Sequence, residues 1–335
     1  MNAQAELVSV VLPVYNGSQY LRQSIESILQ QSYRNFELII INDGSQDDSQ
    51  KIIDSYNDSR IRAFEQANIG LAATLNKGIS LAKGRWIARQ DQDDVSFPER
   101  LTKQVHFMNT NPGYAIVGTA AQIWVEDTKT DRFHRHPCSD PELRAGLMFY
   151  NYFVHSSVLL DKSVVQSIEG YSTDPQRQPP EDYELWSRIV KQYPVANLSN
   201  TLLAYREVGS SMSRDEKNPF SEKLIILSAE NIAWALGISV ELDEVQALAH
   251  LMYRVYPPKL MRGFGWSKAK KLLDQVIAGL ALKTGLDQRQ MHSQQVQLLK
   301  LLRLNYLDCL TGGRLNQMLF GKLRTRLKQF LKVIS

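Results

Sequence analysis

The sequence predicts an α/β fold in which a mostly parallel sheet is flanked by helices and followed by a C-terminal helical extension. Short apolar runs rich in Val and Ile alternate with helical segments of roughly 10 to 15 residues through the first hundred residues, as βαβ units require. Beyond residue 220 the helical period continues, interrupted at Pro257-Pro258 and Gly312-Gly313. With 335 residues, 43% of them hydrophobic and 22% charged, the chain has an ordinary globular composition.

The predicted elements follow one another in a regular order. β-branched apolar runs predict strands at residues 7–14, 36–41, 61–64 and 85–89. Apolar residues three and four apart, such as Leu21, Ile25 and Ile28, predict helices at 18–31, 47–56, 71–82 and 98–108. Strands at 114–125 and 156–161 and a helix at 181–192 extend this unit to about residue 207. We therefore expect a catalytic domain at 1–209, a polar linker at 210–219 and a helical region at 220–335.

Composition also bounds the compartment. Cys138 and Cys309 lie far apart, without a C-x-x-C pair or zinc-ligand spacing, which is typical of a reducing compartment. Residues 1–7 include Glu6 and lack the basic and apolar segments of a signal peptide. No stretch approaches the roughly 18 to 20 apolar residues of a spanning helix. We expect a cytoplasmic protein that is either soluble or bound to the cytoplasmic membrane face.

Polar residues follow each of the first four predicted strands. Tyr15-Asn16, Asn42-Asp43, residues 65–70 and residues 91–94 occupy these positions. Parallel strands place their carboxyl ends at one edge of a sheet, and ligands bind there. We expect these residues to line a common site.

Three carboxylates lie within four residues in Asp91-Gln92-Asp93-Asp94. Such close acids repel one another unless a cation offsets their charge. A D-x-D pair at a strand end suits Mg²⁺ or Mn²⁺, which prefer oxygen ligands and keep positions for phosphate oxygens. The alternative is a solvated turn whose acids cap the next helix, a role that fits Asp94 alone.

Asp43, Asp182 and His155 each have a structural and a functional interpretation. Asp43 belongs to a good turn sequence, but at a strand end it can accept hydrogen bonds from a ribose or a base. Asp182 can stabilise a helix N-terminus or act as a general base, and residues 174–180 before it resemble a mobile closing loop. His155 is either a structural residue or a contact to acceptor or phosphate.

Several motifs in order resemble family 2 glycosyltransferases of the Rossmann-like GT-A fold. The resemblance spans roughly residues 7–210 and does not include the C-terminal third. Its motifs are VSVVLPVYN at 8–16, IIINDGS at 39–45, NIG at 68–70, NKG at 76–78, ARQDQDD at 88–94 and EDYELW at 181–186.

The resemblance implies an inverting hexosyl- or N-acetylhexosaminyl-type transferase. It would move a sugar from a nucleoside diphosphate sugar, UDP-linked, to a hydroxyl acceptor in cell-surface polysaccharide or glycolipid synthesis. Asp93, with Asp91, would bind Mn²⁺ or Mg²⁺, Asp91 would also contact ribose or sugar, and Asp182 would be the base. The nucleotide pocket would be lined by Pro13, Val14, Tyr15, Asp43, Asn68 and Gly70.

One residue departs from the family pattern. Many members have an Arg just before the Asn that matches Asn76, where this chain has Leu75. Base or phosphate contacts at that position are therefore in doubt. Lys77 or Arg89 is the candidate replacement for the missing cation.

The C-terminal tail is basic and amphipathic. From residue 312 onward there are six Lys or Arg and no Asp or Glu, and apolar residues recur at helical spacing. Residues 314–334 can therefore lie on an anionic membrane surface, which would suit a lipid-linked acceptor, or pack on the helices from Phe220 onward. We expect no nucleic-acid partner, because the basic residues do not form a face with stacking aromatics.

Two alternatives share the predicted fold. A sugar-nucleotide-activating nucleotidyltransferase would need a Gly- and Arg/Lys-rich triphosphate loop after the first strand, and residues 13–17 (PVYNG) lack one. A non-catalytic membrane-associated scaffold would have no reason to combine Asp93 with Asp182.

Overall fold

The computed structural model describes residues 6–208 and 220–311. The predicted linker at 210–219 and the basic tail at 314–334 lie outside these residues. The described chain forms two compact units, each built from several segments. The sheet unit contains residues 6–136, 153–175 and 193–208, and the helical unit contains 137–152, 176–192 and 220–311. The α/β fold class with a C-terminal helical region is confirmed.

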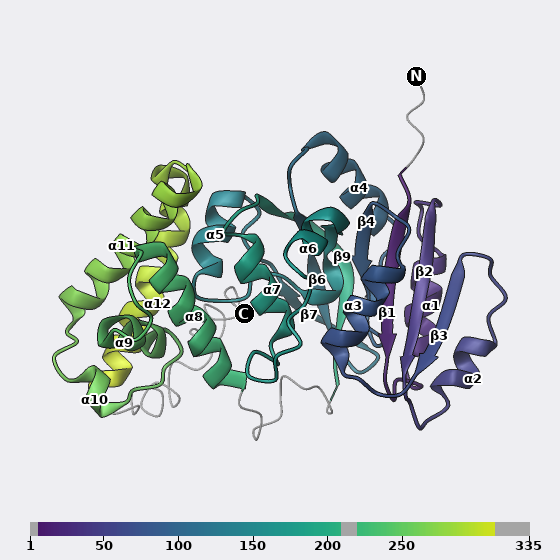
Figure 1. Ribbon diagram of the computed structural model, residues 1–335, viewed down its shortest axis with the longest axis horizontal. Coiled ribbons are helices and arrows are strands. Elements are labelled where there is room, and N and C mark those ends of the chain that lie inside the picture. Colours follow the sequence, from purple (N-terminus) through teal and green to yellow (C-terminus); the bar gives the residue numbers. More distant parts are fainter. Residues whose placement is uncertain (1–5, 209–219, 312–335) are drawn as a thin grey trace. The chain divides into compact units, whose positions relative to one another are not determined.

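The first four strands of the sheet are parallel, as predicted. They are β1 (Val8–Val14), β2 (Phe36–Asp43), β3 (Ile61–Gln66) and β4 (Trp86–Arg89), in the spatial order β3-β2-β1-β4 (Figure 1). Every residue of β1 and β2 is buried. Strands buried on both faces account for the continuous apolar runs in the sequence.

Beyond β4 the sheet is mixed. β8 (Leu159–Asp161) pairs antiparallel with both β4 and β6 (Ile116–Val125), and β6 pairs parallel with β9 (Val195–Glu207). The short β5 (Val95–Ser96) lies antiparallel to β9, and β7 (Thr128–His134) forms a hairpin with β6. The sequence had predicted neither β5, β7 nor β9. β7 is half-exposed and mostly polar, so it lacks the apolar run by which the other strands were recognised.

Helices cover the parallel strands through matched apolar positions. α1 (Leu21–Leu29) and α4 (Arg100–Thr110) contribute to one core with Val10 and Leu12 of β1. α3 (Leu71–Leu81) contacts β1 elsewhere: a Cβ at Gly78 would collide with the side chain of Val11. Successive β1 residues point to opposite faces, so both faces of the strand are covered. The short helices of the unit are α2 (Ser49–Asp54), η1 (His155–Ser157) and α6 (Lys162–Ser167).

The helical unit combines C-terminal helices with two helices from earlier in the chain. Asn231 links them: its Nδ2 donates to the Leu147 carbonyl at 3.3 Å and to Ser187 Oγ at 3.0 Å. Residues 137–152 and 176–192 thus pack with this unit, although the sequence placed them in the first domain. Its helices are α5 (Asp140–Leu147), α7 (Glu181–Ile189), α8 (Phe220–Leu236), α9 (Asp243–Met252), α10 (Pro258–Met261), α11 (Trp266–Thr284), η3 (Gln288–Met291) and α12 (His292–Leu310).

Over the described residues, no helix combines the length and the apolar character needed to cross a bilayer.

Candidate active site

The predicted nucleotide-binding residues follow neighbouring strands. β1 lies between β2 and β4, with Val14 paired to Asn42 and Val11 paired to Arg89. Asp43 pairs in turn with Gln66 of β3. The ends of β1, β2, β3 and β4 therefore bring Tyr15, Asp43, residues 66–70 and residues 91–94 to one edge of the sheet, as the sequence predicted.

Gln92 joins the acidic segment to the end of β1. Its Oε1 accepts a hydrogen bond from the Tyr15 N–H at 2.8 Å, and its Nε2 donates to the Tyr15 carbonyl at 3.1 Å. The Tyr15 side chain is 50% exposed at this edge. Sequence reasoning missed Gln92, because an amide between acids carries no chemical signal of its own.

The loops after β1 and β2 hold one another in place. The Asn16 N–H donates to Ser45 Oγ at 3.0 Å, and the Gln46 N–H donates to Asn16 Oδ1 at 2.8 Å. Pro13 and Val14 lie in β1, and the Val14 side chain is buried in the core. The atoms that Val14 can offer to a nucleotide are therefore those of its main chain.

The Asp43 carboxylate organises the loop that carries Asn68. Oδ1 accepts from Gln66 Nε2 at 2.7 Å and from the Ile69 N–H at 2.9 Å, and Oδ2 accepts from the Gly70 N–H at 3.0 Å. Gly70 has a φ of +87°, a conformation that favours glycine. Asn68 is exposed on the loop fixed in this way.

Both candidate replacement cations have partners within the protein. Lys77 Nζ donates to Gln66 Oε1 at 2.6 Å. Arg89 is buried and forms an ion pair with Asp91. Leu75, where many family members have an Arg, is 1% exposed and belongs to the core. The departure from the family pattern thus lies in the interior of the sheet unit.

Asp91 is held through both carboxylate oxygens. Oδ1 pairs with Arg89 Nη2 at 2.5 Å, and Oδ2 accepts from Ser156 Oγ at 2.9 Å. Burial disfavours the charged form, but the charge of Arg89 and the hydrogen bond from Ser156 oppose this effect, and the pKa of Asp91 is lowered. Asp91 therefore remains a carboxylate at neutral pH.

Asp94 is not the solvated cap that the sequence allowed. It is 1% exposed, its Oδ1 accepts from the Arg206 N–H at 2.8 Å, and its Oδ2 is hydrogen-bonded to Ser156. Burial and the charges of Asp93 and Asp91 raise its pKa well above the ordinary value. The Ser156 hydroxyl lies between the carboxyl groups of Asp91 and Asp94 but has only one proton to donate. A neutral Asp94 therefore supplies the proton of the second hydrogen bond.

Asp93 has the carboxylate best placed to bind a cation. Burial and the adjacent Asp91 raise its pKa to about 6, and no other described residue donates a hydrogen bond to its carboxylate oxygens. Within the described ranges no three His, Cys, Asp or Glu side chains gather as a metal site. Asp93 with Asp91 therefore suits a hard divalent ion only if ligand oxygens, such as those of a diphosphate, complete its coordination.

Arg206, near the end of β9, fixes the acidic segment although it lies far from this segment in the sequence. Its side chain is 1% exposed, and Nε donates to the Asp93 carbonyl at 2.8 Å. Nη2 donates to Gln23 Oε1 at 2.6 Å and Nη1 pairs with Asp127 at 2.7 Å. Sequence reasoning missed Arg206, because an isolated Arg 113 residues from Asp93 gives no local signal.

His155 lies in the electrostatic neighbourhood of Asp91. Burial, together with the charge of Arg89, lowers its pKa to about 3, although Asp91 opposes the shift. Its Nε2 is hydrogen-bonded to the Tyr171 hydroxyl at 2.9 Å. Asn76 fixes Tyr171 by bonding both its N–H and its carbonyl, each at 2.8 Å. At neutral pH His155 is thus a neutral, positioned imidazole.

Asp182 is the second residue of α7 in the helical unit. Its Oδ2 accepts from Asn151 Nδ2 at 2.7 Å, and its Oδ1 accepts from the Tyr183 N–H at 2.7 Å. In the preceding segment, which the sequence predicts to be mobile, Arg177 forms ion pairs with Glu230 at 2.8 Å and with Glu184 at 3.5 Å. The candidate base is therefore positioned by Asn151, a residue that sequence reasoning missed.

Comparison with known sequences gives one consistent family. The sequence model described as Glycosyl transferase family 2 matches residues 9–166. EpsE of Bacillus subtilis, named as a glycosyltransferase, is 37% identical over 213 residues, which are 62% of this chain and 75% of EpsE. The Escherichia coli UDP-Glc:alpha-D-GlcNAc-diphosphoundecaprenol beta-1,3-glucosyltransferase WfaP is 32% identical over 238 residues, 70% of this chain and 88% of WfaP.

The fold is similar to that of a solved structure. Residues 1–349 of TarS from S. aureus, in complex with UDP-GlcNAc, match with a TM-score of 0.59 at 15% identity. The match covers 91% of this chain and 92% of the TarS chain. At this identity the likeness concerns the fold alone.

Proposed function

Because the chain belongs to glycosyltransferase family 2, and is therefore a glycosyltransferase, we propose that it transfers a sugar with inversion from a UDP-sugar to a hydroxyl of a glycan or lipid-linked acceptor. The proposed setting is the synthesis of a cell-surface polysaccharide or glycolipid. The printed names of relatives support this choice: WfaP uses UDP-Glc and a diphosphoundecaprenol-linked acceptor, and WbnJ of Escherichia coli, 34% identical, is an O-antigen biosynthesis glycosyltransferase.

The observation that carries the proposal is the state of Asp93. Its carboxylate is half-buried, has a raised pKa and receives no hydrogen bond from another described residue. It follows β4 at the edge where β1 and β2 bring Tyr15 and Asp43. A divalent ion, Mn²⁺ or Mg²⁺, would supply positive charge to a diphosphate there, with Asp93 and Asp91 as its protein ligands.

The protein groups divide the remaining work. Tyr15 and Asp43, with the loop of Asn68 and Gly70, hold the nucleoside. Lys77 is connected to Asp43 through hydrogen bonds of the Gln66 side chain. Asp182 takes the proton of the acceptor hydroxyl as the acceptor oxygen bonds to the anomeric carbon. The bond from that carbon to the diphosphate breaks, and the nucleoside diphosphate leaves with the bonding electrons. This single displacement inverts the anomeric centre and needs no covalent nucleophile.

The alternatives have less support. A nucleotidyltransferase needs cations in the loop after β1, but residues 13–17 contain no Lys or Arg. The N–H and Oδ1 of Asn16 in this loop are bonded to residues of the β2–α2 loop. A non-catalytic scaffold does not agree with membership of a transferase family. We also propose that the protein works on the cytoplasmic membrane face, with residues 314–334 as the contact.

A transfer assay with the purified full-length chain tests the function. The enzyme is incubated with Mn²⁺ or Mg²⁺, diphosphoundecaprenol-linked N-acetylglucosamine and a panel of UDP-, GDP- and dTDP-sugars, and product linkages are determined by NMR. We expect a β-linked product from an α-linked UDP-sugar. Retained anomeric configuration, or transfer only from a non-UDP donor, would contradict the corresponding part of the proposal.

A further inference from the structure

The helical unit contains a cavity beside Asp182 that the proposed chemistry does not yet use. Its volume is about 370 Å³, within the range typical of small-ligand sites. Pro180 and Tyr183, the residues near Asp182 in sequence, belong to its lining. Asn151 also lines it and donates a hydrogen bond to Asp182 Oδ2 at 2.7 Å. The cavity therefore lies beside the side-chain amide that holds the candidate base in place.

Four of the nine residues that line the cavity are tyrosines. Tyr150 packs edge-to-face against Tyr152, with ring centroids 6.5 Å apart, and lies 5.2 Å from the Tyr253 ring. Tyr183, which also lines the cavity, is completely buried. These rings offer flat apolar surfaces of fixed orientation.

The hydroxyl groups of these tyrosines are used within the protein. Tyr150 donates to the Met252 carbonyl, Tyr183 to the Leu147 carbonyl and Tyr253 to the Phe149 carbonyl. These bonds hold the rings in place and leave their carbon surfaces to face a ligand. The side-chain amide of Asn151 then becomes the polar group nearest the base.

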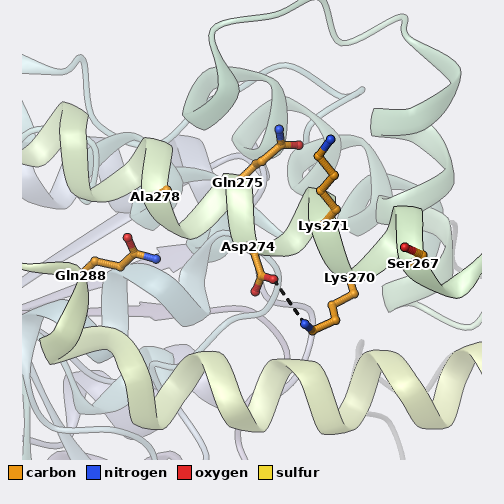
Figure 2. A pocket seen from close by; sticks show the side chains of 7 residues that line it. All are labelled: Ser267, Lys270, Lys271, Asp274, Gln275, Ala278 and Gln288. Carbon is orange, nitrogen blue, oxygen red and sulfur yellow. Dashed lines mark ion pairs between the residues drawn. The ribbon is translucent and has the colours of Figure 1, made fainter.

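The second hollow of the helical unit has a different character. It lies along α11, and Figure 2 shows charged and amide side chains around it, with Lys270 paired to Asp274 at 3.9 Å. Lysines on an exposed helix do not form a built binding site. The aromatic cavity is the better candidate, because it combines enclosure with a direct link to Asp182.

We propose that the aromatic cavity binds the sugar ring of the acceptor, with the C–H face of a pyranose against Tyr150 and Tyr253 and a hydroxyl near Asn151. This inference rests on the proposed function of Asp182 as the base. One face of a pyranose carries several C–H bonds and packs on aromatic rings, whereas its rim of hydroxyls needs polar partners such as an amide. A complete polyprenyl chain would instead overfill a cavity of about 370 Å³.

Saturation-transfer NMR with methyl N-acetyl-α-glucosaminide as the probe tests the site directly on the full chain. We expect saturation of the ring C–H protons in the wild type, loss of this signal in Leu224→Trp, which fills the cavity from its wall, and loss in Tyr150→Leu. Tyr150→Phe keeps the ring and should retain the signal. If Leu224→Trp binds the sugar as the wild type does, or if undecaprenyl phosphate displaces the sugar, the assignment is wrong.

Kinetics separate this inference from the proposed function. In Leu224→Trp, the KM for the acceptor should rise at least about 10-fold, since the lost contacts act on one substrate. Stabilisation by UDP and slow hydrolysis of the UDP-sugar should not change. Transfer with an unaltered acceptor KM would overturn the cavity assignment alone, whereas sugar binding without transfer from any donor would overturn the proposed function alone.

Discussion

Gln92 is hydrogen-bonded to both main-chain groups of Tyr15, accepting from the N–H at 2.8 Å and donating to the carbonyl at 3.1 Å. The acidic segment is thereby connected to the strand end that carries an exposed aromatic ring. The end of β1 and the acidic segment, which are separate motifs in the sequence, are thus held together by Gln92.

Replacing Gln92 with Leu should weaken both stability and donor binding. Loss of the two hydrogen bonds should cost about 1–2 kcal/mol of unfolding free energy and lower the Tm by a few degrees. UDP affinity should fall, because the acidic segment would no longer be held in a fixed position next to Tyr15. Thermal unfolding with and without UDP measures both effects. Gln30→Leu, at an exposed position on the same unit, is the control and should change neither.

Replacing Asp93 with Asn should abolish metal-dependent binding of UDP. The amide keeps the shape of the side chain but removes the charge that a divalent ion needs. Calorimetric titration of UDP with Mn²⁺ or with EDTA measures the difference. In the wild type the metal-dependent part should also weaken as the pH falls through about 6, where Asp93 takes up a proton.

The matched control for this experiment is Asp131→Asn, an exposed acid on β7. It should leave the metal dependence intact. Equal loss in both variants would show that general charge, and not the Asp93 site, determines metal binding.

Replacing Asp182 with Asn should separate binding from chemistry. The variant should bind UDP-sugar normally, and its turnover should fall by roughly 10²- to 10⁴-fold, the range for loss of a general base. Initial rates with saturating acceptor measure the loss. Full turnover with the native acceptor would mean that another group removes the proton.

Replacing Arg206 with Met should destabilise the sheet unit strongly. Met approximates the volume of the side chain but leaves the Asp93 carbonyl and Gln23 without their donors. Breaking such a buried charged network costs about 3 kcal/mol or more. Urea unfolding measures the change, with the exposed Arg289→Met as control. A cost equal to that of the control would refute the structural role of Arg206.

Stability should decrease on mild acidification in a way that involves His136. Burial, together with the nearby His134, lowers the pKa of His136 to about 4 from an ordinary 6.5. Between pH 6.5 and about 4 the unfolded chain therefore binds a proton that the folded chain does not. The free energy of unfolding consequently decreases as the pH falls from 7 toward 4. After allowance for partial solvent access, we expect His136 to account for a loss of roughly 2 kcal/mol in the free energy of unfolding.

The His136→Gln variant isolates that contribution. Urea unfolding at pH 7 and at pH 4.5 should show a smaller loss in the variant than in the wild type, because the amide does not titrate. An identical loss in both proteins would assign the acid sensitivity to other groups.

The sequence predicted the parallel half of the sheet well, because each strand there is an apolar run followed by a polar strand end. β9 escaped prediction, since exposed polar residues at 199–200 interrupt its 13-residue length. The clustering of Tyr15, Asp43 and residues 91–94 could be deduced, because parallel topology alone places successive strand ends together.

Other parts of the site depend on tertiary pairing and left no local signal. Ser156 bonds two acids more than 60 residues away, and Asn151 bonds Asp182 from 31 residues away. Neither residue type has a periodicity or motif that indicates such a role. The fate of Asp94 was likewise unpredictable, because burial of a carboxyl group depends on the partner strand that covers it.

The attachment of Arg206 to the acidic segment has a consequence for the order of events during synthesis. The strand ends of the proposed donor site are complete once β4 has emerged. The Asp93 carbonyl and the Asp94 carboxyl, however, obtain their partners from Arg206, which is made more than a hundred positions later. A nascent chain released at residue 166, where the family match ends, would contain all three acids without this support. The hydrogen bonds that hold the acidic segment are therefore complete only after β9 has been synthesised and has joined the sheet.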